Sequence, residues 1–277
     1  MLTGSKPAPV GVALAVMLLG IGCARRPTQL VTLSGSTSLQ PLAEKWVAAY
    51  RVQHPELTIA VQGGGSTAGV QATVSGAAQI GMVSRALTRA ERSSVREVPV
   101  ARDGIALVVH PSNPISDVTL ADARAIYSGR RTEWPKQHGG RALTITVITR
   151  EEGSGTRAAF ETLVLGGSPI VANALVSDST GAVRQMVATD AAAIGYVSIG
   201  LLDATVKPLR LDGVQPNERN IDQGSYPLVR PLLFTVKGEP TRPTAHFMAW
   251  VVGSEGRALT RREGMLPAQG TAADASP

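Results

Sequence analysis

Cysteine is almost absent from this 277-residue sequence. Cys23 is the single cysteine, so no disulfide can form within the chain. It follows the apolar run "VGVALAVMLLGIG" at residues 10–22, which is too short to cross a bilayer comfortably as a helix. Lys6 is the only charged side chain before Cys23, and small residues end the run, a pattern typical of secretory signals. We therefore predict a signal peptide over residues 1–22 and an exported protein.

The position of Cys23 is also typical of a bacterial lipobox. In that motif the cysteine follows the apolar run, is lipidated and becomes the mature N-terminus. Here Gly20 occupies the position where leucine is usual, and Leu19 lies one place early. We expect Cys23 to be lipidated and to anchor the protein to a membrane. Signal cleavage without a lipid is the alternative.

Aromatic residues are scarce, at 4% of the sequence, so the core must consist mainly of Val, Leu, Ile and Ala. The formal charge is +6, but the basic residues are scattered. A nucleic-acid groove needs clustered basic residues with aromatic side chains among them, so we expect no nucleic-acid partner. A mildly basic surface instead favours a small anion.

Several enzyme motifs are missing. The sequence has neither the G-x-x-x-x-G-K-[ST] of a P-loop nor the G-x-S-x-G of a hydrolase elbow. Its four histidines show no metal-ligand spacing, so we expect no metal, no cofactor and no catalysis. One weak enzyme signal is "GSGTRA" at 153–158, with Asp178 where a ribose-binding acid would lie. An exported dinucleotide-dependent enzyme is therefore one alternative.

Apolar runs typical of strands alternate with helix-like segments, which predicts an α/β fold with largely parallel sheets. The expected strands are 30–33, 56–62, 105–110, 143–148 and 231–236, and the clearest helices are 38–50, 66–76 and 245–253. Residues 66–84 also resemble residues 179–198. This similarity indicates two related lobes, although chance similarity between Ala-rich helices is the alternative.

Three predicted strands end in turns of Gly, Ser and Thr that begin helices. These turns are "LSGSTS" (33–38), "QGGGSTAG" (62–69) and "REEGSGTR" (150–157). The start of a helix leaves backbone N–H groups unpaired, glycine allows close approach to a ligand, and hydroxyl groups add donors. A single turn of this kind is usually an N-cap. Three in one exported chain predict an anion site at converging helix starts.

A fourth segment, "IGMVSRALT" at 80–88, ends an apolar run with Ser84 and Arg85. Arg150 offers a planar fork that suits tetrahedral oxyanions, and Glu152 could hold that guanidinium in position. A surface arginine is the alternative for Arg150.

Taken in order, "SGSTSLQPLAEKW", "GGGSTAGV", "IGMVSR", "REEGSGTR" and "AIGYVS" resemble the motifs of the phosphate-binding proteins of ABC transporters, which belong to the type II periplasmic binding-protein superfamily. The resemblance covers about residues 30–255. It implies two α/β lobes, each a mostly parallel sheet flanked by helices, with phosphate in the cleft between them. It also implies delivery of the ligand to a membrane permease.

The resemblance assigns phosphate-binding roles by position. The implied ligands are Thr37, Ser38, Ser66, Ser84, Arg150, Ser154, Gly155 and Thr156. Glu152 and Arg85 are expected to contact these residues rather than the phosphate itself. Many members of the family have an aspartate at the Ser84 position, where it accepts the proton of hydrogen phosphate. Because serine stands here, the sequence predicts binding of an oxyanion more firmly than it predicts a preference for phosphate over sulfate.

We expect lobe one to comprise residues 28–109 and 204–262, lobe two to comprise 110–203, and residues 263–277 to be disordered. The expected protein is a monomer in the periplasm or at the outer face of the cell membrane. Binding of molybdate, tungstate or sulfate, and phosphate sensing by a lipoprotein, are alternatives.

Overall fold

The computed structural model describes residues 29–135 and 142–269, together with Met1 and Gly4. Cys23 and the apolar run before it lie outside the described residues, so the signal peptide and the lipid anchor remain predictions.

One sheet runs through both halves of the molecule in the order β2-β1-β3-β11-β4-β8-β6-β7, with β9 and β12 also paired to β4, and β5 and β10 form a separate pair. The strands are β1 (Gln29–Gly35), β2 (Leu57–Gly63), β3 (Ile80–Val83), β4 (Arg96–Val109), β5 (Asp117–Val118), β6 (Thr146–Arg150), β7 (Leu175–Ser177), β8 (Ala193–Ser198), β9 (Lys207–Pro208), β10 (Arg210–Leu211), β11 (Val229–Val236) and β12 (Leu266–Pro267). The helices are α1 (Gln40–Gln53), α2 (Ser66–Ser75), α3 (Arg89–Ser94), α4 (Leu120–Tyr127), α5 (Gly155–Phe160), the π-helical η1 (Glu161–Leu165), α6 (Thr180–Thr189), the 3₁₀ turn η2 (Ile199–Leu201), α7 (Glu218–Asp222), α8 (Arg242–Val252) and α9 (Ser254–Arg262).

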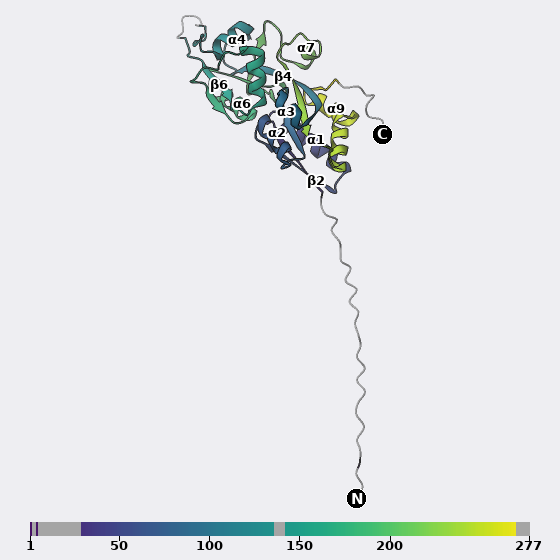
Figure 1. Ribbon diagram of the computed structural model, residues 1–277. Helices are drawn as coiled ribbons and strands as arrows, with labels where there is room; N and C mark the ends of the chain where they lie inside the picture. Colours follow the sequence, from purple (N-terminus) through teal and green to yellow (C-terminus); the bar gives the residue numbers. More distant parts are fainter. Residues whose placement is uncertain (2–3, 5–28, 136–141, 270–277) are drawn as a thin grey trace.

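Two lobes share this sheet. In the first lobe β2, β1 and β3 are parallel, as expected for strands joined by helices. In the second lobe β7, β6 and β8 are parallel. Figure 1 shows α4 and α6 around one lobe and α1, α2 and α9 around the other, with β4 between them.

Strand β4 belongs to both lobes. From Arg96 to Gly104 it pairs with β11, and from Ile105 to Val109 it pairs with β8. We propose that the lobe boundary lies at this change of partner and, on the returning chain, near Leu228.

This boundary differs from the one expected from the sequence for residues 204–228. These residues were assigned to lobe one, but β9 pairs with the second half of β4, and Val206, Leu209 and Tyr226 pack in the core of the second lobe. Burial of these apolar side chains holds the segment on the second lobe until the chain returns to the first lobe in β11.

Each lobe has its own hydrophobic core, and the few aromatic side chains are divided between the two. In the first, Trp46 of α1 packs edge-to-face on Phe234 of β11, with ring centroids 5.8 Å apart. In the second, Phe160 and Tyr196 stack with centroids 4.2 Å apart. Nine of the ten Phe, Trp and Tyr side chains are buried in this way, and only Trp250 is partly exposed.

The internal similarity corresponds to equivalent units. Helix α2 leads into β3, which pairs in parallel with β1, and α6 leads into β8, which pairs in parallel with β6. Each lobe therefore contains the same helix-to-strand unit.

The predicted disordered tail is wrong for its first residues. Leu266 and Pro267 form β12 against β4, and Met265 and Leu266 are buried. The apolar sequence "MLPA" pairs with the sheet, whereas residues 270–277 lie outside the described residues.

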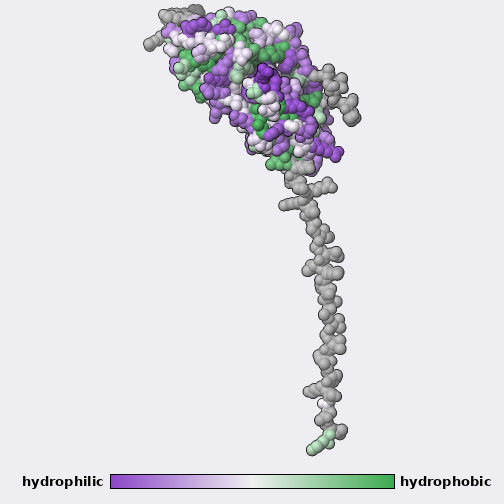
Figure 2. Space-filling view, in the orientation of Figure 1, coloured by the Kyte–Doolittle hydropathy of each residue, from purple (hydrophilic) through white to green (hydrophobic). Residues whose placement is uncertain are grey.

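Most of the surface visible in Figure 2 is hydrophilic, with hydrophobic residues in small areas. Within residues 29–135 and 142–269, no helix combines the length and the apolar character needed to cross a membrane.

Helix α2 lies very close to the sheet because Gly69 has no side chain. A Cβ at Gly69 would lie 2.6 Å from the Ser34 carbonyl oxygen and 2.9 Å from both Gly35 Cα and Met82 O. All three are backbone atoms, which cannot move aside cheaply. This contact sets the position of Ser66, at the start of the same helix.

We predict that Gly69→Ala lowers the free energy of unfolding by about 1–3 kcal/mol, the usual cost of overpacking. Gly181→Ala in α6 is the matched control, because a Cβ there meets nothing within 4 Å and should be neutral or slightly stabilising. Urea unfolding of both variants measures the difference. Equal stability of the two would show that α2 can shift freely on the sheet.

Candidate functional site

The predicted hydroxyl-bearing turns meet between the two lobes. Thr156 Oγ1, at the start of α5, donates to Ser38 Oγ at 3.4 Å, and Ser36 Oγ lies 3.0 Å from Ser38 Oγ. Ser66 Oγ, at the start of α2, lies 3.3 Å from Ser84 Oγ and accepts from the Ser84 backbone N–H at 3.0 Å. Residues distant in sequence thus form one group, in which all but the half-buried Thr37 are buried. We call it the donor cluster: Ser36, Thr37, Ser38, Ser66, Ser84, Arg150, Ser154, Gly155, Thr156 and Thr180.

Gly155 allows the two lobes to approach closely. A Cβ at this position would lie 2.2 Å from Ser66 Oγ and 2.7 Å from Ser84 Oγ. Nearby, the Thr67 backbone N–H donates to the Gly153 carbonyl oxygen at 3.1 Å. The first turn of α5 therefore lies against the start of α2 and the end of β3, which requires glycine at 155.

Arg150 ends β6 and is 1% exposed. Its Nη1 donates to Thr180 Oγ1 at 2.8 Å, and its Nη2 donates to Thr37 Oγ1 at 3.1 Å and to the Asp178 carbonyl oxygen at 3.3 Å. The surface-arginine alternative is therefore wrong. The guanidinium instead connects the first lobe, through Thr37, with the second.

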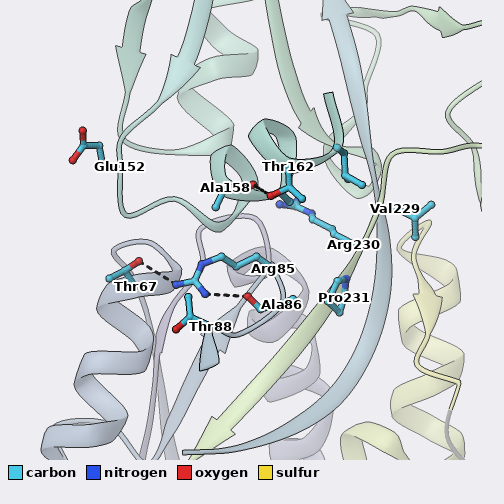
Figure 3. A pocket seen from close by; sticks show the side chains of 12 residues that line it. Thr67, Arg85, Ala86, Thr88, Glu152, Ala158, Thr162, Val229, Arg230 and Pro231 are labelled. Atoms are coloured by element: carbon cyan, nitrogen blue, oxygen red, sulfur yellow. Dashed lines mark hydrogen bonds between the residues drawn. The ribbon is translucent and has the colours of Figure 1, made fainter. Parts of the chain in front are cut away.

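The carboxylate that pairs with Arg150 is Glu151, which corrects the expectation for Glu152. Arg150 Nε and Nη2 donate to the two oxygens of Glu151, each at 2.8 Å. Glu152 is exposed, and in Figure 3 its carboxylate points away from the other labelled side chains. The turn directs the Glu151 carboxylate toward the guanidinium and the Glu152 carboxylate toward solvent.

Ser154 has the simpler role that was considered for such turns. It is the N-cap of α5, and its Oγ accepts from the Arg157 backbone N–H at 3.2 Å. It is nevertheless buried beside Gly155 and Thr156, and its hydroxyl keeps a proton that it can donate.

Thr37 and Thr180 face each other across the lobes. Thr37 Oγ1 accepts from Arg150 and, at 3.4 Å, from the Thr180 backbone N–H. With both lone pairs accepting, the Thr37 hydroxyl can act toward a ligand only as a donor. Sequence reasoning missed Thr180, although the similarity of residues 66–84 to 179–198 places it beside the counterpart of Ser66.

A second buried ion pair, Asp103 with Arg230, was also missed. The two residues lie directly opposite each other on β4 and β11. Arg230 Nε and Nη2 donate to Asp103 Oδ2 at 3.0 and 2.7 Å, and Ser198 Oγ donates to Oδ1 at 2.9 Å. Burial raises the pKa of the Asp103 carboxyl, while Arg230 and Ser198 oppose that rise. The signal in the sequence was an ionisable residue just before each of two apolar runs, 105–110 and 231–236.

Arg230 reaches from this pair into the donor cluster. Its Nη1 donates to Thr156 Oγ1 at 2.6 Å and to the Ser84 carbonyl oxygen at 3.3 Å. Arg150 within the cluster and Arg230 at its edge therefore place two guanidinium groups there, each neutralised by its own carboxylate. The cluster can bind an anion through many fixed donors rather than through a large excess of positive charge.

Arg85 lies just outside the donor cluster. Its Nη1 and Nη2 donate to the two oxygens of Glu91, each at 2.7 Å, and Nη2 also donates to Thr67 Oγ1 at 3.3 Å. The Arg85 hydrogen bond is the largest cause that lowers the pKa of Glu91 from 4.5 to about 2.

Beside the donor cluster is a groove of about 530 Å³ between the lobes. Figure 3 shows Arg85, Thr88 and Pro231 on one side of it and Ala158 and Thr162 on the other. Its walls are largely apolar. Across residues 29–135 and 142–269, no three or more His, Cys, Asp or Glu side chains are grouped to hold a metal ion.

Comparison with known proteins gives the class and the family. Residues 24–255 match the PBP superfamily domain. The sequence is 30% identical over 242 residues to the phosphate-binding protein PstS of Bacillus subtilis, which covers 86% of this chain and 80% of that protein.

Two solved structures are also similar. One, from Clostridium perfringens, is named for a role as substrate-binding protein of a phosphate ABC transporter and contains bound phosphate. It is 35% identical, with a TM-score of 0.83 over 87% of this chain and 100% of that one. The other is an ABC-type phosphate transport receptor of Vibrio cholerae, 36% identical, with a TM-score of 0.70 over 85% of this chain and 99% of that one.

The fold and the site thus define a two-lobed binding protein of the PBP superfamily. Within it, the chain belongs to the family of PstS phosphate-binding proteins. The predicted α/β type II periplasmic-binding fold and the resemblance to phosphate-binding proteins are both confirmed. This is a family of substrate-binding proteins rather than of enzymes.

The Arg85–Glu91 pair gives a pH prediction. Because the pKa of Glu91 is lowered from 4.5 to about 2 in the folded state, its stabilisation is fully present above pH 4.5 and is lost as the pH falls toward 2. Glu91→Gln should therefore be less stable than the parent protein at pH 7, and the gap should close between pH 4.5 and 2.

Chemical denaturation at several pH values measures this gap. Glu97→Gln is the control, since Glu97 makes only an exposed contact of 3.6 Å with Arg92 and should cost little at any pH. A gap for Glu91→Gln that stays constant down to pH 2 would contradict the prediction.

Proposed function

We propose that this protein binds inorganic phosphate in the donor cluster and delivers it to an ABC permease. The observation that carries the proposal is the meeting of Arg150 with hydroxyl groups from both lobes. Membership of the PstS family and similarity to a phosphate-bound structure support phosphate as the ligand. The proposed ligands are Thr37, Ser38, Ser66, Ser84, Arg150, Ser154, Gly155 and Thr156.

The energetics favour many donors. Removing a doubly charged oxyanion from water costs many kcal/mol. Each hydrogen bond to a charged group returns about 1.5–3 kcal/mol, and a micromolar site needs a surplus of about 8 kcal/mol. Eight proposed ligands on two lobes can supply that surplus, whereas one arginine cannot.

The cellular role follows from the same proposal. The chain is exported, is held at the outer face of a membrane by lipid on Cys23, acts as a monomer and does no chemistry on its ligand. Family membership supports an extracytoplasmic binding role, and the apolar run before Cys23 supports the anchor.

Arg150→Ala should weaken phosphate binding by at least about 2 kcal/mol, roughly a thirty-fold rise in Kd, because charged hydrogen bonds to the ligand are lost. Titration calorimetry of the mature protein measures the change.

Arg210→Ala is the control for this variant. Arg210 pairs with Asp117 at 3.0 Å on the second lobe, away from the cluster, and its loss changes the net charge equally. Unchanged phosphate affinity in Arg150→Ala would remove Arg150 from the binding site.

A second candidate is a broader oxyanion-binding protein for sulfate, molybdate or tungstate. It is favoured by the state of the acids at the cluster, since Glu151 and Asp103 both accept hydrogen bonds from arginines. Both carboxylates are thus paired with arginines, and serine stands at position 84 in place of an aspartate acceptor.

We therefore predict measurable competition by sulfate, which has no proton to offer. Phosphate titrations in the presence of increasing sulfate test this. If a large excess of sulfate leaves the apparent Kd for phosphate unchanged, the site discriminates by means other than a carboxylate acceptor, and the broader candidate fails.

A further inference from the structure

The groove beside the donor cluster is much larger than an inorganic anion requires. It is lined by Thr67 and Arg85 from the first lobe, by Ala158, Ala159 and Leu163 from α5 and η1, and by the start of β11. Thr67 and Arg85 directly follow Ser66 and Ser84 in sequence, so the groove adjoins the donors. A phosphate monoester placed with its phosphoryl group in the cluster would have space there for an apolar substituent.

Arg230 lies at the boundary between the groove and the cluster. It lines the groove, yet its side chain is only 1% exposed. Its Nη1 donates to Thr156 Oγ1 on one lobe and to the Ser84 carbonyl oxygen on the other. The guanidinium thus spans the gap between two residues that would face the ligand.

This guanidinium is held firmly. Two of its nitrogens donate to Asp103 Oδ2, and Asp103 is fully buried and also accepts from Ser198. If Arg230 swung away, the Asp103 carboxylate would be left buried without its partner, which is costly. Displacement of Arg230 by an incoming ligand is therefore unfavourable.

We propose that Arg230 is a specificity-determining positioning residue: it closes the donor cluster on its groove side and so restricts the ligand to an unsubstituted oxyanion. A monoester is excluded because its substituent would have to occupy the place of the guanidinium. This inference rests on the proposed binding of phosphate.

The test compares phosphate with phenyl phosphate by titration calorimetry, in the parent protein and in Asp103→Asn/Arg230→Ala. The double variant removes both charges of the pair, which avoids leaving a buried charge unpaired. In the parent protein, phenyl phosphate should bind at least 100-fold more weakly than phosphate. In the double variant this ratio should fall at least tenfold.

The ratio of the two dissociation constants separates a change in specificity from general damage to the site, because general damage would weaken the binding of both ligands alike. Asp117→Asn/Arg210→Ala removes a partly exposed pair of the same residue types and should leave the ratio unchanged. Adding Thr162→Trp to the Asp103→Asn/Arg230→Ala variant should fill the groove and abolish the gained ester binding.

An unchanged ratio in the double variant overturns the inference, as does phenyl phosphate binding to the parent protein as tightly as phosphate. If the double variant does not fold, Arg230→Lys keeps the charge pair but shortens and narrows the head group. An unchanged ratio there is then equally decisive. Absence of phosphate binding to the parent protein would instead overturn the proposed function.

Discussion

The burial of the Arg150 guanidinium is the constraint on which the site depends. A buried cation must be neutralised and its N–H groups must find acceptors, and here these come from Glu151, Thr180, the Asp178 carbonyl and Thr37. Because Thr37 belongs to the other lobe, satisfying one side chain also fixes how the two lobes meet. Arg230 repeats the arrangement with Asp103 and Thr156, so two neutralised cations position the hydroxyl groups around them.

Much of the fold could be predicted from the sequence because its longer strands and helices have clear apolar patterns. The parallel strands, the two lobes and the repeated helix-to-strand unit follow from those patterns. The lobe assignment of residues 204–228 and the tail did not follow, because β9, β10 and β12 are two residues long. A strand of that length has no periodicity to detect, and its place is set by the neighbour with which it pairs.

The site, too, could be predicted only in part. Turn composition found the hydroxyl groups and Arg150, because Gly, Ser and Thr at strand ends are visible in the sequence. It could not choose between Glu151 and Glu152, which differ only in the direction that the turn gives them. Asp103 and Arg230 lie on β4 and β11, far apart in the sequence. That they neutralise each other becomes visible only when the two strands are paired in register.

Strand β4 carries a mechanical consequence. The two lobes share one unbroken fourteen-residue strand, hydrogen-bonded to β11 on one half and to β8 on the other. Any rotation of one lobe against the other must therefore bend a paired strand near Gly104 instead of swinging on a slack loop. Arg230 lies opposite Asp103, beside that bend, and would move little. Thr67 lies across the groove from Pro231 (Figure 3) and would move farther. A small rotation would therefore leave the Arg230 side of the groove almost stationary while the Thr67 side opens.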